Sequence, residues 1–165
     1  STFNITVNAL PVVTQSPFAN VCLNSGLITL TGGSPSGGVY SGTAVSSGQF
    51  NPALAGVGTY SILYTYTDVN GCSGSASQNI TVNAIPTVAL GNNVTQCGGT
   101  ILLDAQNPGL SYLWSTSATT QTITVSASGN YYVIVTDGNG CTNSDTIAII
   151  INFQPVVALG NDSIL

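Results

Sequence analysis

Apolar and polar residues alternate with a period of two along much of this chain. The clearest case is residues 59–67, where alternate positions from Tyr60 to Tyr66 fall on one face and those from Ser61 to Thr67 on the other. Such alternation predicts a half-buried β-strand, and no segment of ten or more residues has an apolar period near 3.6. The apolar residues are mainly Val, Ile, Leu and Tyr among Thr and Ser, which is typical of strands. We therefore predict an all-β protein.

Turn residues divide the chain into short strands. The expected strands are residues 27–31, 39–40, 49–50, 59–67, 79–82, 101–103, 112–114, 121–125, 131–136 and 146–151. Asn51 and Pro52 open a turn or a single helical turn, and Asp68 to Gly71 form a hairpin turn, since Asn-Gly supplies its positive φ angles. Short strands between Gly, Asn and Ser turns predict a β-sandwich.

Internal repeats indicate two successive units. Residues 4–11 (NITVNALP) recur as residues 79–86 (NITVNAIP), and residues 86–92 (PTVALGN) recur as residues 155–161 (PVVALGN). The hairpin string TDVNGC at residues 67–72 returns as TDGNGC at residues 136–141. We expect domains at residues 10–84 and 85–153, the last strand of a preceding unit at 1–9 and the first strand of a following unit at 154–165.

This frame predicts a piece of a longer array, or a polymer with exchanged strands. The chain starts at Ser1 rather than Met and carries no signal peptide, so we expect a mature or excised segment.

Four cysteines permit three connectivities, among which sequence alone does not choose. The repeats do choose, because each unit holds one early and one late cysteine. We expect the disulfides Cys22–Cys72 and Cys97–Cys141, and an oxidising compartment. Four buried free thiols are the alternative. Trp114 lies between Cys97 and Cys141, as the core tryptophan of an immunoglobulin domain does between its cysteines, but here the late cysteine follows the turn instead of lying inside the preceding strand.

Composition excludes most catalytic machinery. The chain has no Lys, Arg or His, and its five acidic residues are single, scattered Asp. A Ser-His-Asp or Cys-His arrangement, a Schiff-base lysine and a histidine zinc site are therefore impossible. We predict that the protein is not an enzyme.

Charge and hydropathy limit the partners in the same way. The formal net charge is −5 with no cation, which excludes the usual binding to phosphates and argues against binding anionic membranes. The longest aliphatic run, Ile147 to Ile151, is far shorter than the ~20 residues of a membrane-spanning helix. We expect neither nucleic acid nor direct membrane insertion.

Several strings resemble repeats of long Bacteroidetes cell-surface and gliding-motility-associated proteins. These strings are Tyr40-Ser-Gly, GQFNP at 48–52, AGVGTY at 55–60, YTYTDVNGC at 64–72, YLWS at 112–115, TTQTITV at 119–125, SGNY at 128–131 and TDGNGC at 136–141. The resemblance implies tandem immunoglobulin-like or PKD-like β-sandwiches, export across the outer membrane and a role as stalk, adhesin or filament. It carries over no binding residue.

The same resemblance implies O-glycosylation at Asp followed by Ser or Thr and an aliphatic residue. Asp145-Thr146-Ile147 and Asp162-Ser163-Ile164 fit, so Thr146 and Ser163 are candidate acceptors, with chance occurrence as the alternative.

Two further candidate sites also have a purely structural explanation. Asp68 with Asn70, and Asp137 with Asn139, offer oxygens to Ca²⁺. One carboxylate in each turn, however, supplies few of the 6–8 oxygen ligands that this cation takes. We favour side-chain-capped turns and expect no cofactor. The rings of three tyrosines, Tyr60, Tyr64 and Tyr66, share one strand face on which a sugar would stack. We favour the alternative, in which these rings pack in the core.

Three hypotheses for function follow. The first is a structural repeat module of an extracellular adhesin, stalk or fibre, whose partners are neighbouring repeats or like subunits. The second is a filament subunit joined by terminal strand exchange. The third is an adhesin domain that binds a surface glycan or protein.

Overall fold

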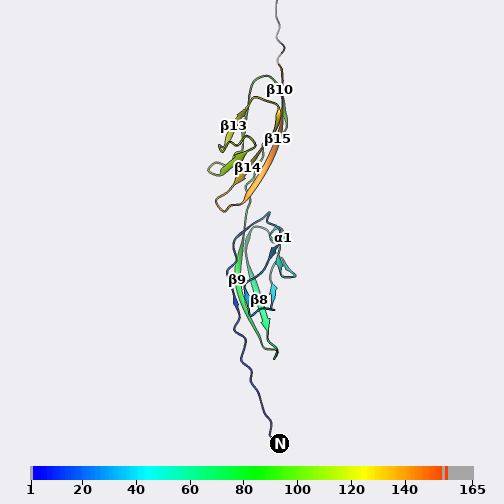
Figure 1. The fold of residues 1–165 in the computed structure, drawn as a ribbon, viewed down its shortest axis with the longest axis vertical. Helices are drawn as coiled ribbons and strands as arrows, with labels where there is room; N and C mark the ends of the chain where they lie inside the picture. Colours follow the sequence, from blue (N-terminus) through cyan, green and yellow to red (C-terminus); the bar gives the residue numbers. More distant parts are fainter. Residues whose placement is uncertain (1, 154, 156–165) are drawn as a thin grey trace, which may run out of the picture. The chain divides into compact units, whose positions relative to one another are not determined.

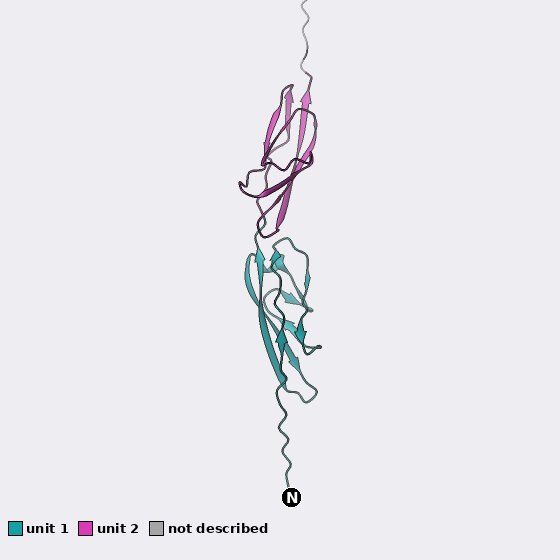
Figure 2. Ribbon diagram, turned by 60° about the vertical axis from the view of Figure 1, so that its left-hand side comes forward, with its two compact units in different colours: residues 1–85 teal, residues 86–165 magenta. Residues whose placement is uncertain are grey.

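The computed structural model describes residues 2–153 and 155, and the chain divides into two compact units, residues 1–85 and 86–165. The boundary follows Ile85, one residue after the predicted domain boundary. Figure 2 shows the two units in different colours. Whether residues 1–9 and 154–165 belong to neighbouring units stays a prediction, and residues 154 and 156–165 lie outside the described residues.

Unit 1 is built around a long hairpin (Figure 1). Its elements are β1 (Thr14–Gln15), β2 (Val21–Cys22), β3 (Ile28–Thr29), β4 (Gly33–Ser34), β5 (Val39–Ser41), β6 (Val45–Ser46), β7 (Gln49–Phe50), α1 (Pro52–Ala55), β8 (Gly58–Thr67) and β9 (Ser73–Asn83). One sheet has the order β2-β9-β8-β5, a second β3-β7-β6, and β1 pairs with β4. The strand β2 runs parallel to β9, whereas the other pairings of the unit are antiparallel.

Unit 2 repeats this plan with fewer strands. Its strands are β10 (Val94–Cys97), β11 (Ile101–Asp104), β12 (Ser111–Trp114), β13 (Thr122–Val125), β14 (Gly129–Thr136) and β15 (Thr142–Asn152). One sheet has the order β10-β15-β14-β12, with β10 parallel to β15, and the other pairs β11 with β13. The second and fourth strands thus form one sheet, and the first, third, fifth and sixth strands the other. Apart from the first strand, this is the sorting of an immunoglobulin-like sandwich. The predicted all-β, tandem immunoglobulin-like fold is confirmed.

The alternating residues of the long hairpins contribute to both cores. In unit 1 the core is Leu30, Phe50, Ile62, Ile80 and Val82. In unit 2 it is Leu103, Ala105, Trp114, Val125, Val133, Val135, Ile147 and Ile149. Because side chains alternate between the faces of a strand, each hairpin buries one face and leaves the other to solvent.

The only α-helix among the described residues is one turn long. Asn51 caps α1: its Oδ1 accepts a hydrogen bond from the Leu54 amide at 3.2 Å, and Pro52 occupies the first turn. Asn51 and Pro52 thus open a helical turn, as one of the two readings of the sequence expected. No helix of residues 2–153 and 155 is long and apolar enough to cross a membrane.

Candidate functional sites

The cysteines differ from the sequence prediction. Cys22 and Cys141 are disulfide-bonded, whereas Cys72 and Cys97 are free thiols. The predicted pairs Cys22–Cys72 and Cys97–Cys141, one within each unit, are therefore wrong. The geometry of each unit taken by itself explains why.

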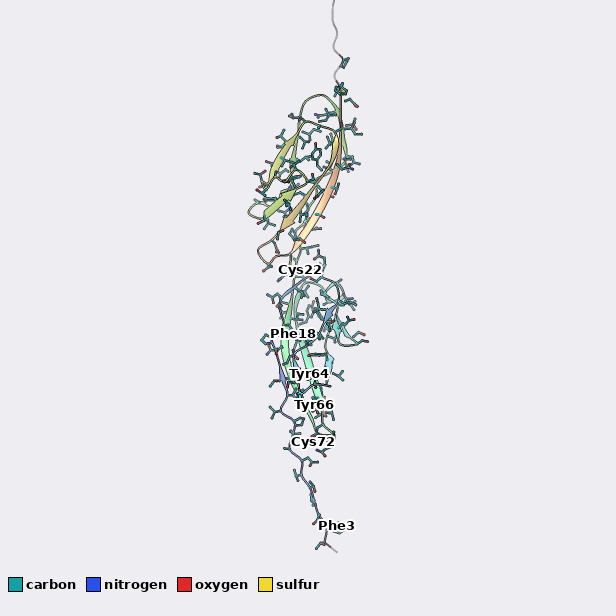
Figure 3. The ribbon with its side chains drawn as sticks, in the orientation of Figure 1. Phe3, Phe18, Cys22, Tyr64, Tyr66 and Cys72 are labelled. Carbon is teal, nitrogen blue, oxygen red and sulfur yellow. The ribbon has the colours of Figure 1, made fainter. Side chains whose placement is uncertain are left out.

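In unit 1 the two cysteines lie at opposite ends of one strand. Cys22 is in register with Asn83, the last residue of β9, whereas Cys72 immediately precedes Ser73, the first residue of β9. Eleven steps of about 3.3 Å put Cys72 roughly 35 Å from Asn83. Since a disulfide requires Cα atoms about 4–7 Å apart, no bond forms between them. Figure 3 shows Cys22 and Cys72 at the two ends of the unit.

Unit 2 has the same arrangement. Cys97 is in register with Asn152, the last residue of β15, and Cys141 immediately precedes Thr142, the first. The separation along β15 is again roughly 35 Å. Each unit thus has one early and one late cysteine, and the two lie at opposite ends of its sheet. Their order along the sequence does not show this separation.

Each unit therefore has two poles, which we define by where the chain enters and leaves. The N-terminal pole contains the hairpin turn, because residues just after the turn lie close to the segment by which the chain enters the unit. In unit 1, a Cβ built on Gly74 would come 2.6 Å from the carbonyl oxygen of Pro11. In unit 2, Asn143 Nδ2 donates a hydrogen bond to the Pro86 carbonyl at 2.8 Å. The C-terminal pole lies at the end of β9 or β15. The hairpin cysteine marks the first pole and the cysteine of β2 or β10 marks the second.

The hairpin aspartates cap their own turns. Asp68 Oδ1 accepts hydrogen bonds from the amides of Asn70 and Cys72, both at 2.9 Å. Asp137 Oδ1 accepts from Asn139 at 2.9 Å and from Cys141 at 2.8 Å. The carboxylates proposed as calcium ligands thus stabilise the turn backbone. Asn70 and Asn139 join these sites through their backbone amides.

The candidate glycosylation site on β15 has one exposed and one structural residue. Thr146 is exposed, opposite Tyr132 of β14. Its neighbour Asp145 is half-buried, and Asp145 Oδ2 accepts a hydrogen bond from the Leu90 amide at 2.7 Å. Asp145 therefore holds the segment before β10 to β15, a role that needs no modification. Ser163 lies outside the described residues.

The tyrosines of β8 face inward. Tyr64 is 3% exposed, its hydroxyl donates to the Pro35 carbonyl at 2.6 Å, and the same oxygen accepts from the Gly38 amide at 2.7 Å. The Tyr60 hydroxyl donates to the carbonyls of Ala55 and Gly56. The hydroxyls of Tyr60 and Tyr64 are thus occupied by backbone groups of the protein, and the Tyr64 ring is buried.

Trp114 also belongs to a core. It is 2% exposed and its Nε1 donates to the Thr120 carbonyl at 2.8 Å. Its surroundings are the aliphatic core of unit 2, and the disulfide that the immunoglobulin analogy places beside it is absent from that core.

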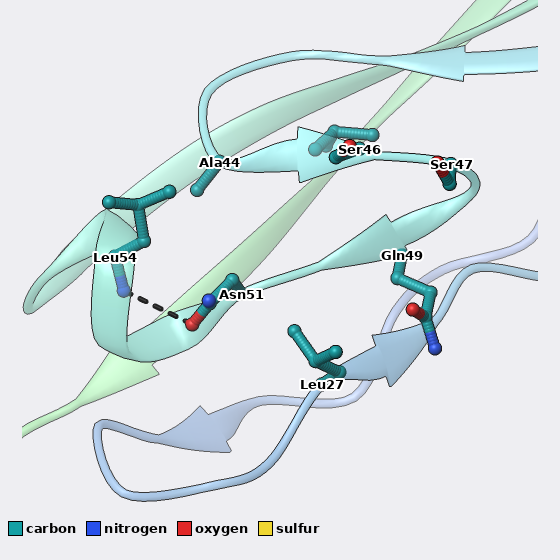
Figure 4. Close-up of a pocket in the computed structure, with 8 residues that line it drawn as sticks. Leu27, Ala44, Ser46, Ser47, Gln49, Asn51 and Leu54 are labelled. Carbon is teal, nitrogen blue, oxygen red and sulfur yellow. Dashed lines mark hydrogen bonds between the residues drawn. The ribbon is translucent and has the colours of Figure 1, made fainter.

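A shallow hollow in unit 1 is the site that the sequence did not predict (Figure 4). Its volume is about 450 Å³, and it is lined by Leu27, Ala44, Val45, Ser46, Ser47, Gln49, Asn51 and Leu54. Leu27 and Leu54 are exposed, and the side chain of Asn51 caps α1 by accepting a hydrogen bond from the Leu54 amide. The lining residues come from β6, β7, α1 and the loops beside them and share no motif, so no sequence signal marks the hollow.

The described residues offer little for chemistry. No cluster of three or more His, Cys, Asp or Glu side chains that would hold a metal ion occurs within residues 2–153 and 155. Asp68, Asp104, Asp137 and Asp145 each accept hydrogen bonds that stabilise local structure.

Comparisons with known proteins give structural likenesses only. No protein-family model and no curated protein matches the sequence. A Bacteroides ovatus glucan-utilisation protein, SGBP-B, solved with a mixed-linkage heptasaccharide, is 19% identical over 88% of this chain, with a TM-score of 0.31, and the chain spans 46% of its length. The insect immune protein hemolin is 15% identical over 84% of this chain and 46% of its own, with a TM-score of 0.40. The first two immunoglobulin domains of DIP-gamma are 11% identical over 86% of this chain and 98% of theirs, with a TM-score of 0.37.

Proposed function

We propose that this chain is a stretch of a non-enzymatic extracellular surface protein, in which immunoglobulin-like units follow one another as a structural stalk, fibre or adhesin shaft. The sequence strings of the two units resemble repeats of long Bacteroidetes surface proteins. The observation that carries the proposal is the placement of the two poles at opposite ends of the long hairpin in each unit.

Opposite poles suit a series of units. A unit that the chain enters at one end and leaves at the other adds its own length, roughly 35 Å of strand, to the reach of the array. Units whose two termini lay side by side would increase the mass of the array without increasing its length.

The chemistry of the chain suits the outside of a cell. A disulfide persists in an oxidising compartment, and the complete absence of Lys and Arg leaves trypsin-like proteases no site. The four acidic residues that the structure describes accept hydrogen bonds from backbone amides.

The deciding experiment is the intact mass of the native protein, before and after reduction and without proteolysis. A mass of hundreds of kilodaltons in both states would support a long covalent array. A mass near 16.6 kDa would overturn the stalk as stated and leave a small subunit.

The N-terminal segment favours strand exchange as a second candidate function. Phe3, Ile5 and Val7 alternate with polar residues and are 92%, 88% and 88% exposed, so a strand-like apolar face has no cover in this chain. Removal of residues 1–9, or of residues 154–165, should then abolish polymerisation while circular dichroism and the melting transition persist. Unchanged polymerisation of both truncated chains would exclude it.

The hollow in unit 1 supports a third candidate function, an adhesin domain that binds a surface glycan or protein. Leu27 and Leu54 offer apolar surface beside the hydroxyls of Ser46 and Ser47. A glycan array tests it: a binder lost in Leu54→Asp but kept in Leu102→Asp, an exposed leucine of unit 2, would support the site, and no binder at all would count against a glycan ligand.

A further inference from the structure

We propose that the hollow of unit 1 binds a neutral sugar, that is, an uncharged saccharide unit of a glycan. The inference rests on the third candidate function and deepens it, because it names the class of ligand and the side chains that contact it. Charged sugars and purely apolar protein side chains are thereby excluded as ligands of this site.

The hollow is the solvent-facing side of the small sheet β3-β7-β6. Phe50 of β7 is fully buried, and side chains alternate between the faces of a strand, so its neighbours Gln49 and Asn51 face away from the core. On β6, Ser46 lies opposite Gln49, and the Ala44 carbonyl accepts a hydrogen bond from the Asn51 amide at 2.9 Å. The floor of the hollow is therefore a set of polar and small side chains on two paired strands.

Two leucines form apolar walls beside this floor. Leu27 immediately precedes β3 and is 59% exposed, and Leu54 belongs to α1 and is 73% exposed. The Asn51 cap fixes the start of α1 and with it the position of Leu54 (Figure 4). A sugar ring carries hydroxyl groups at its edge and C–H groups on its faces, so it matches a site that combines apolar walls with a polar floor.

The polar side chains of the hollow are available to a ligand. The amide of Gln49 and the hydroxyls of Ser46 and Ser47 make no hydrogen bond with a described residue. Gln49 offers two N–H donors and a carbonyl acceptor, and each hydroxyl is both donor and acceptor. Since Gln49 is half-buried, an apolar group placed over it would remove water without replacing the lost hydrogen bonds. A ligand with its own hydroxyl groups replaces them, which favours a sugar over an apolar side chain.

The corresponding face of unit 2 has no such free amide. In each unit the strand after the parallel one is followed by a buried residue, Leu30 or Ala105, and the residue before it is exposed, Thr29 in unit 1 and Asp104 in unit 2. Asp104 Oδ1 accepts a hydrogen bond from Gln121 Nε2 at 2.9 Å. The polar groups of this face in unit 2 thus bind one another, so we assign the site to unit 1 alone.

Charge restricts the ligand to a neutral one. No residue that lines the hollow is ionisable, so neither an anionic nor a cationic ligand finds a partner of opposite charge there. The net charge of −5, with no cation in the chain, further disfavours an anion. The hollow has a volume of about 450 Å³, within the range of roughly 300–1,000 Å³ of small-molecule sites.

An NMR titration of the 165-residue chain tests the site, with the neutral disaccharides lactose, cellobiose, maltose and mannobiose and the acidic digalacturonate as ligands. At least one neutral disaccharide should shift the amide signals of Ser46, Ser47 and Gln49, and digalacturonate should leave them unchanged. Equal binding of digalacturonate, or shifts confined to residues outside the hollow, would overturn the neutral-sugar site and leave the adhesin candidate standing. No binding by any of the five ligands would overturn the site and count against a glycan-binding adhesin as well.

Three variants separate the hydrogen-bonding floor from the apolar walls. Gln49→Met keeps the length of the side chain and removes its amide, so the dissociation constant for the neutral disaccharide should rise by about 5-fold, and Leu54→Ala should weaken binding similarly. The control is Leu63→Ala, an exposed leucine on the other sheet of unit 1, which should bind as the unaltered protein does.

Gln49→Met should also keep the melting temperature of the unaltered protein, because the Gln49 side chain bonds to no described residue. Unchanged or tighter binding of the disaccharide by Gln49→Met would show that the ligand contacts are apolar and would overturn the inference.

Discussion

The buried hydroxyl of Tyr64 shows how a single side chain fixes the loop beside β5. A Cβ built on Gly33 or Gly38 would approach the Tyr64 ring to 2.6 or 2.5 Å, so glycine is required where the loop crosses the ring. The hydroxyl then satisfies one backbone donor and one acceptor of this loop.

Tyr64→Phe should therefore lower the free energy of unfolding by about 1–3 kcal/mol, because the Gly38 amide and Pro35 carbonyl lose their partner in a buried place. Urea denaturation checks this. The control is Tyr66→Phe: Tyr66 is half-buried on the same strand and its hydroxyl bonds to no described residue, so a change within about 0.5 kcal/mol is expected. Equal losses in both variants would contradict the role of the hydroxyl.

The hairpin aspartates act as backbone acceptors. Asp137→Ala removes the acceptor for the amides of Asn139 and Cys141 and should cost about 1–2 kcal/mol, whereas Asp137→Asn keeps an amide oxygen in the same place and should retain most of the stability. Thermal melts of the three proteins give the comparison. A loss in Asp137→Asn as large as in Asp137→Ala would show that the charge itself is needed.

Calcium binding at these turns has a separate test. Because Oδ1 of Asp68 and of Asp137 is already occupied by two amides, we expect no shift in melting temperature between EDTA and about 1 mM Ca²⁺, the weak end of extracellular calcium modules. A rise in melting temperature that disappears in Asp137→Asn would reinstate the calcium site.

At the scale of elements, side-chain hydrogen bonds attach the segment before β10 to β15. Asp145 Oδ2 accepts from Leu90, Asn143 Nδ2 donates to Pro86, and Asn93 Oδ1 accepts from Ala148 at 2.9 Å. These bonds occupy backbone groups along the margin of the sheet that a bare edge would leave open to other chains.

Asp145→Ala should thus destabilise the unglycosylated protein by about 1–2 kcal/mol, while Thr146→Ala, at an exposed position, should change stability by less than about 0.5 kcal/mol. Bacterial expression without glycosylation followed by urea denaturation separates the two roles. If Asp145→Ala were neutral there, its place in the candidate acceptor site would become its principal role.

The expected strands correspond to β3, β5, β7 to β9 and β11 to β15, because their apolar residues alternate. The sequence did not indicate β1, β2, β4, β6 or β10, each of which holds at most one aliphatic or aromatic side chain. The start of β9 was also missed, since Ser73 to Gln78 contains a single apolar side chain, Ala76, and forms a strand because it pairs with β8.

The cysteine pairing failed for a related reason. Without β2 and β10, nothing in the sequence shows that Cys22 and Cys97 lie beside the end of the last strand instead of near the hairpin. The position of Cys72 and Cys141 directly after their turns was the available signal, because a residue at a hairpin tip is far from the interior site of an immunoglobulin disulfide.

For the whole molecule, the redox state of the four cysteines is a property that a thiol count tests. Cys22 and Cys141 are disulfide-bonded, whereas Cys72 and Cys97 are free thiols. The unfolded protein should therefore react with a thiol reagent at two cysteines without reductant and at four after reduction, because a sulfur–sulfur bond keeps its two cysteines from reacting. Cys72→Ser, which removes one free thiol, should lower both counts by one. Four reactive thiols in the unreduced protein would show that no disulfide forms in solution, and the argument from an oxidising compartment would lose its support.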